Sequence, residues 1–69
     1  MIANDDELKG TQARIVYFED LLAQMRVAAS AELFPSMASG YRAEIEKMQR
    51  EVLEFLTRHV SQSPPARVA

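Results

Sequence analysis

Apolar residues recur at alternating spacings of three and four in two stretches of this chain, one on either side of Pro35. Such spacing places the side chains on one stripe of an α-helix, so each stretch predicts an amphipathic helix. The first stripe consists of Leu8, Thr11, Ile15, Phe18, Leu22, Met25 and Ala29, and the second of Tyr41, Ile45, Met48, Val52, Phe55 and His59. The expected fold class is therefore all-α.

The first helix is predicted over about residues 4–31, which contain no proline. Either Asn4 or Asp5 can cap it, because a short polar side chain accepts a hydrogen bond from a first-turn amide. Acidic residues follow at once, where negative charge favours the positive end of the helix dipole.

Pro35 predicts the break between the helices, because a proline pushes the residue before it, here Phe34, away from helical angles. We expect a turn at about 32–35 and a second helix over about 36–60. Ser36 and Ser39 are both candidate caps for this helix.

A short turn between two helices of similar length predicts an antiparallel hairpin that spans residues 1–60. Residues 61–69, which contain two adjacent prolines, are predicted to form a flexible tail. Folding the chain about its centre pairs Phe18 with Met48. Small residues on both sides of the turn, among them Ala29 and Gly40, predict a close approach of the helices there.

Five large apolar side chains fall outside the two stripes: Tyr17, Leu21, Leu53, Leu56 and Val60. A soluble monomer seldom exposes such a patch, and a chain this short without disulfides usually needs another source of burial. The sequence therefore predicts a homodimer in which two hairpins form a four-helix bundle, with these five residues at the interface. The alternative is that the patch binds a different protein.

Charged residues of alternating sign occupy another side of the second helix, at a spacing of four: Arg42, Glu46, Arg50, Glu54 and Arg58. Because each base has an acidic neighbour, this series is interpreted as the solvent-facing side.

No set of residues predicts catalysis, a cofactor or a metal site. The chain has no cysteine and one histidine, His59, which is interpreted as structural. The residue three positions before it is Leu56, so the Glu-x-x-His pair of di-metal helical bundles is missing. The sequence also has no glycine-rich phosphate loop, so we expect a protein that is not an enzyme.

Charge and hydropathy exclude two further classes of partner. The net charge is −2 and the basic residues are interleaved with acids, which argues against direct nucleic-acid binding. The longest apolar run has four residues, Ile15 to Phe18, where a membrane span needs about 20. The acidic start of the chain is unlike a secretory signal, so the expected location is cytoplasmic.

Three segments of the chain resemble short bacterial helical-hairpin proteins of unknown biochemical role. The segments run from Ile2 to Leu22, from Tyr41 to Met48 and from Val52 to Leu56. Similar segments form the leading helices of some helix-turn-helix antitoxin-type regulators. The resemblance implies an interaction module, or alternatively an antitoxin-like or regulatory accessory protein that acts through a partner protein. This chain departs from the regulators where Pro64 and Pro65 replace a DNA-binding domain.

Overall fold

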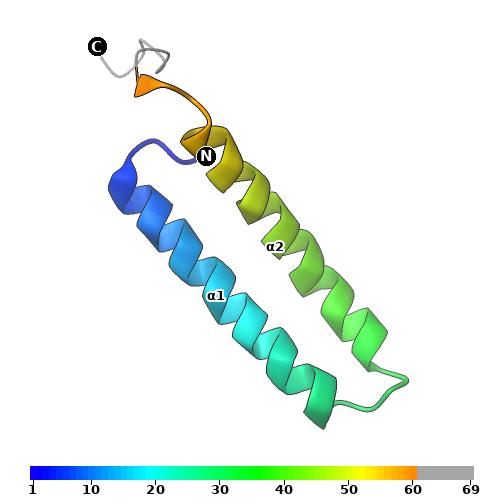
Figure 1. Ribbon diagram of the computed structural model, residues 1–69. Helices are drawn as coiled ribbons and strands as arrows, with labels where there is room; N and C mark the ends of the chain where they lie inside the picture. The colour runs from blue at the N-terminus through cyan, green and yellow to red at the C-terminus, as the bar shows by residue number, and fades with distance from the viewer. Residues whose placement is uncertain (61–69) are drawn as a thin grey trace.

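The computed structural model describes residues 1–60, and in this part of the chain two α-helices run antiparallel and pack against each other (Figure 1). Helix α1 spans Asp5–Ala28 and helix α2 spans Phe34–Leu56. The predicted all-α hairpin is confirmed. The predicted tail, 61–69, lies outside the described residues. Neither helix has an apolar stretch long enough to cross a membrane.

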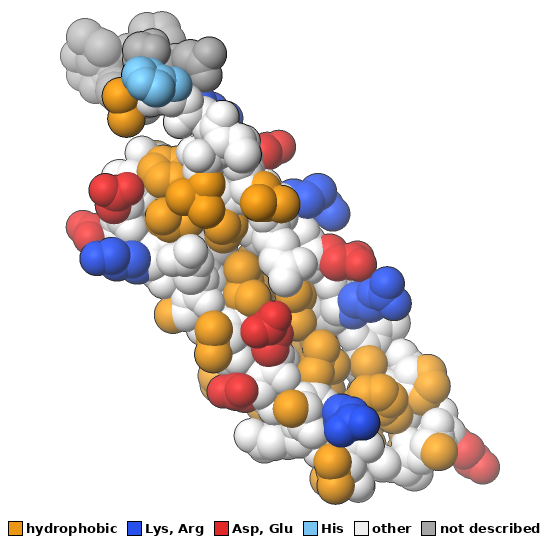
Figure 2. Space-filling view, in the orientation of Figure 1, with side chains coloured by type: hydrophobic (Ala, Val, Ile, Leu, Met, Phe, Trp, Pro, Cys, Tyr) orange, Lys and Arg blue, Asp and Glu red, His pale blue; other side chains and the backbone are white. Residues whose placement is uncertain are grey.

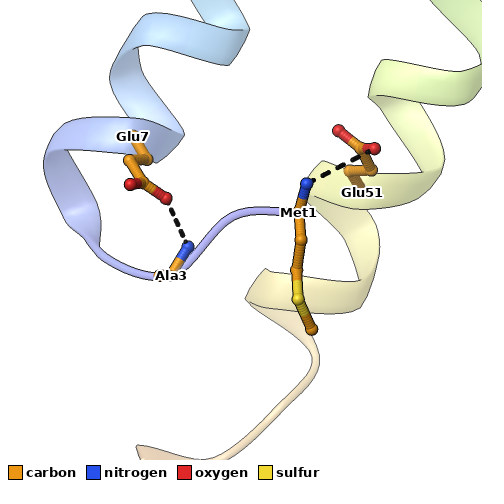
Figure 3. A network of polar contacts seen from close by, with 4 residues as sticks. All are labelled: Met1, Ala3, Glu7 and Glu51. Atoms are coloured by element: carbon orange, nitrogen blue, oxygen red, sulfur yellow. Dashed lines mark hydrogen bonds and ion pairs between the residues drawn. The ribbon is translucent and has the colours of Figure 1, made fainter. Parts of the chain in front are cut away.

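Helix α1 begins with two hydrogen bonds between side chains and backbone amides, and Figure 3 shows the one between Ala3 and Glu7. The backbone N–H of Glu7 donates to Oδ1 of Asn4 at 2.9 Å, and the backbone N–H of Ala3 donates to Oε1 of Glu7 at 2.8 Å. The arrangement is similar to a capping box, except that the Glu7 side chain accepts from the amide of Ala3 rather than from that of the N-cap residue. Of the two predicted caps, Asn4 is the one used.

The turn comes earlier in the chain than predicted. Helix α1 ends at Ala28 rather than near residue 31, because Ala29 adopts extended backbone angles. Ser30 then fixes a tight turn: its Oγ accepts a hydrogen bond from the N–H of Leu33, and its carbonyl accepts one from the N–H of Phe34. These local hydrogen bonds replace the helical ones and reverse the chain.

Helix α2 begins two residues before the predicted start, with Phe34 already helical and Pro35 in the first turn. A proline there costs little because first-turn amides lack helical partners anyway. Neither predicted cap is used. Leu33 occupies the N-cap position without a side-chain hydrogen bond, and Oγ of Ser39 instead donates to the carbonyl of Ser36.

Helix α2 ends at Leu56, four residues before the predicted end. The N–H and the hydroxyl of Thr57 both donate to the carbonyl of Leu53, at 3.0 and 2.6 Å. The next N–H, that of Arg58, donates to the carbonyl of Phe55, three residues back instead of four, and the α-helical pattern stops there. His59 and Val60 therefore lie beyond the helix, and both are exposed. The prediction that His59 continues the second stripe is wrong.

The predicted stripes otherwise form the contact between the helices. All seven residues of the first stripe are half-buried, and in the second stripe Ile45 and Met48 are fully buried. The ring of Phe18 lies edge-on to the ring of Tyr41, with 5.6 Å between centroids. Tyr41 is two helical turns nearer the bend than Met48, the predicted partner of Phe18, because the bend is centred earlier in the chain.

Gly40 lies on the exposed surface of α2, which contradicts the predicted close approach to Ala29. A Cβ atom added to this glycine would meet nothing within 4 Å. With the bend centred earlier, the seam of α2 runs through Tyr41 and Ile45, and Gly40 points away from it.

Candidate interaction surfaces

The hairpin is a single layer of two helices, so each helix covers only one side of the other. Among the described residues only Ile2, Ile45 and Met48 are buried. Apolar side chains fill a band between the two helices and reach the surface of the molecule (Figure 2). The large apolar residues that stay exposed are Met1, Val16, Tyr17, Val27, Leu33, Met37, Leu53, Leu56 and Val60.

One apolar groove lies between the helices towards the open end of the hairpin, and we call it the open-end groove. It is lined by Gln12, Ile15, Val16, Gln49, Val52 and Leu53. Val16 is 54% exposed and Leu53 is 60% exposed, so each helix contributes one prominent apolar side chain. Leu56 stands three residues after Leu53 on α2 and extends the same apolar surface.

A second groove, the turn-end groove, lies near the bend. It is lined by Leu21, Gln24, Met25, Ala28, Ala29 and Met37. Tyr17 lies one turn before Leu21 on the same side of α1. Its ring packs 5.7 Å from that of Phe18, and the residue is 60% exposed.

The two grooves lie on opposite faces of the hairpin. At 3.6 residues per turn, Val16 and Leu21 are separated by about 140° around α1, and Met37 and Leu53 by about 160° around α2. The stripe that contacts the other helix lies between the members of each pair.

The predicted patch is therefore divided. Tyr17 and Leu21 belong to the face of the turn-end groove, whereas Leu53 and Leu56 belong to the face of the open-end groove. Val60 lies past the end of α2 and on neither helical face. Periodicity placed these residues beside their stripes, but only the packing of the helices decides which flanks share a face.

The N-terminal segment covers part of the face that carries the turn-end groove. The ammonium group of Met1 lies 3.7 Å from Oε2 of Glu51 (Figure 3). Ile2, the next residue, is 6% exposed. Glu51 follows Met37 by two heptads, so both lie on the same flank of α2, away from Leu53. At the open end of the hairpin, the segment thus covers the face opposite the open-end groove.

On the face that carries the open-end groove, charged residues occupy the part nearer the bend. Glu19 follows Gln12 by seven residues on α1, and on α2 Glu46 precedes Leu53 by seven. Arg42 lies one turn nearer the bend, and its Nε donates to Oε2 of Glu46 at 3.2 Å. This face is therefore apolar in its open-end half. Its turn-end half carries the charged groups together with Val27, which follows Val16 by eleven residues, about three turns, and is 79% exposed.

Three residues that shape these surfaces were not predicted to do so. Val16 and Met37 were hidden within or beside the predicted stripes. Ile2 was not recognised as a core residue, because it lies before the predicted helix, where helical periodicity assigns no face. Within residues 1–60 there is no group of three or more histidine, aspartate or glutamate side chains placed to hold a metal ion.

No protein-family model, curated protein or solved structure matches this chain. The resemblance to bacterial helical hairpins and to the leading helices of antitoxin-type regulators stays a prediction.

Proposed function

We propose that this protein is a non-enzymatic interaction module that self-associates through its apolar helix faces into a four-helix bundle. The observation that carries the proposal is the shortage of burial in a single hairpin. Three side chains are buried among residues 1–60, while nine large apolar residues are exposed. Exposed apolar surface of this extent is typical of proteins that associate.

The energetics favour the same conclusion. Burial of apolar side chains is the main favourable contribution to folding, and each residue fixed in a helix loses conformational entropy. Three buried side chains are few against two ordered helices of 24 and 23 residues. A second hairpin laid on the first adds burial without adding loops, which is how many small helical proteins gain stability.

Sedimentation equilibrium tests the proposal directly. The chain mass is 7.8 kDa, and we expect a species of twice that mass at concentrations of tens of micromolar or more, as is usual for modest interfaces. A well-folded monomer over the whole concentration range would rule out self-association.

The division of the apolar surface favours a second candidate, an accessory protein that acts through a partner protein. Two separate faces allow one to serve the dimer and the other, which carries the turn-end groove, to bind a different protein. An adjacent reading frame for a toxin or a DNA-binding protein would favour this candidate. For this candidate we expect this chain to co-purify with the protein that the adjacent reading frame encodes. We expect Met37→Glu, in the turn-end groove, to abolish the co-purification. We propose a cytoplasmic setting in both cases, since a chain without cysteine contains no disulfide of the kind common in oxidising compartments.

A further inference from the structure

We propose that the open-end groove is the dimer interface, and that a second copy of this chain docks on it with its bend pointing the opposite way. This inference rests on the proposed self-association, and it names the face and the orientation. The face is the one on which Gln12, Val16, Gln49 and Leu53 line the groove, with Leu56 beside them.

The two faces of the hairpin differ in how much of the open end is already covered. On the face that carries the turn-end groove, the open end is covered by the segment from Met1 to Ala3. This segment folds back and buries Ile2, and the ammonium group of Met1 lies beside Glu51. On the other face Val16, Leu53 and Leu56 remain more than half exposed. The uncovered apolar surface at the open end is therefore that of the open-end groove.

The polar residues of the groove fit a second copy. Gln12 and Gln49 are its two polar lining residues, one from each helix, and both are exposed. A glutamine amide is both a donor and an acceptor, so it can pair with its own copy across a two-fold axis. A lone carboxylate or ammonium group could not pair with its own copy in this way. The surface is thus self-complementary at its centre.

The charges on the same face select the orientation. If both bends pointed the same way, α1 would lie over α2 of the partner. Glu19 and Glu46 lie one turn beyond Val16 and Gln49 towards the bend, so Glu19 would then face Glu46 of the partner subunit. The ion pair of Glu46 with Arg42 would be covered there together with Glu19, and covering charged groups is unfavourable because they lose water. With the bends pointing opposite ways, the apolar halves overlap and each helix lies over its own copy.

A pair of matched substitutions tests the face. Leu53 and Tyr17 are both 60% exposed but lie on opposite faces. Leu53→Glu places a charge in the proposed interface, and we expect the dimer dissociation constant to rise at least about 100-fold, whereas Tyr17→Glu leaves it within about threefold. Sedimentation equilibrium gives the constants, and circular dichroism checks the helix content. Loss of the dimer in Tyr17→Glu with retention in Leu53→Glu overturns the assignment of the face, while self-association itself stands. A monomeric wild type overturns both.

Cysteine cross-linking tests the orientation and does not depend on how the glutamate variants fold. The chain has no native cysteine, so Gln12→Cys and Gln49→Cys each introduce a single thiol. With opposed bends, each variant alone forms a disulfide-linked dimer under mild oxidation, because each position lies near its own copy. If only a mixture of the two variants cross-links, the bends point the same way and the proposed orientation is wrong. A dimeric wild type with no cross-link in any combination overturns the face.

Discussion

Gly40 is a residue whose role depends on what surrounds it. It lies inside α2, has a negative φ like every glycine described, and has open space where a Cβ would be. Glycine in an exposed helix interior is about 1 kcal/mol less favourable than alanine. We expect Gly40→Ala to raise the free energy of unfolding by about that amount in a thermal melt. Gly10→Ala, also at an open site, is the matched comparison. A lower stability for Gly40→Ala alone would show that the assembled protein covers this position.

Ile2 is the opposite case, a residue near the chain terminus that belongs to the core. Only 6% of its surface is exposed, although the flanking residues Met1 and Ala3 are exposed. We expect Ile2→Ala to lower the free energy of unfolding by about 2 kcal/mol, at the lower end for a buried isoleucine because the site lies at the edge of the hairpin. Ile2→Val should lose about 1 kcal/mol or less. Urea melts measure both, and equal stability of wild type and Ile2→Ala would mean that the segment does not pack in solution.

At the level of the element, α1 depends on its first turn. Asn4 and Glu7 satisfy two backbone amides that would otherwise lack protein partners, and Asp5 and Asp6 add negative charge at the positive end of the dipole. We expect Asn4→Ala to cost about 1 kcal/mol and to reduce the helical signal in circular dichroism. Asn4→Asp keeps the acceptor oxygen and should stay within a few tenths of a kcal/mol of the wild type. If the alanine and aspartate variants melt together, the cap contributes nothing.

The positions of the helix ends also explain why the bend and His59 lie elsewhere than predicted. Ser30 and Thr57 lie just beyond the ends of α1 and α2 and form local hydrogen bonds there, at 3.2 Å to the N–H of Leu33 and at 2.6 Å to the carbonyl of Leu53. Serine and threonine compete with the helix in this way wherever the chain leaves it. Both helices end earlier than predicted, so the bend lies nearer the N-terminus and His59 lies outside the helical stripe.

At the scale of the whole molecule, a thermal melt can detect whether folding is coupled to association. If burial in a second copy stabilises the hairpin, mass action makes the midpoint of unfolding depend on concentration. We expect the melting temperature to rise by several degrees between roughly 5 and 500 µM chain. Leu56→Glu should lower the melting temperature and remove most of this dependence, since Leu56 adjoins the open-end groove. A wild-type midpoint that is the same at both concentrations would indicate a hairpin that is stable alone.

The sequence alone was enough to find the two helices and the residues through which they pack against each other. A spacing of three and four fixes the angular position of each side chain around its helix, whatever the rest of the chain does. This is why the predicted stripe of α1 is half-buried throughout and why Ile45 and Met48 of the second stripe are buried. The cap of α1 was narrowed to Asn4 or Asp5, because such a hydrogen bond spans only three residues, and the structure uses Asn4.

Contacts between distant parts of the chain were decided by the tertiary structure. The ring contact between Phe18 and Tyr41 follows from where the bend is centred, and the burial of Ile2 follows from a segment that folds back to place Met1 beside Glu51. The separation of Tyr17 from Leu53 depends on which flank of α1 lies beside which flank of α2. Periodicity describes each helix about its own axis, and a shared face exists only when two axes are placed side by side.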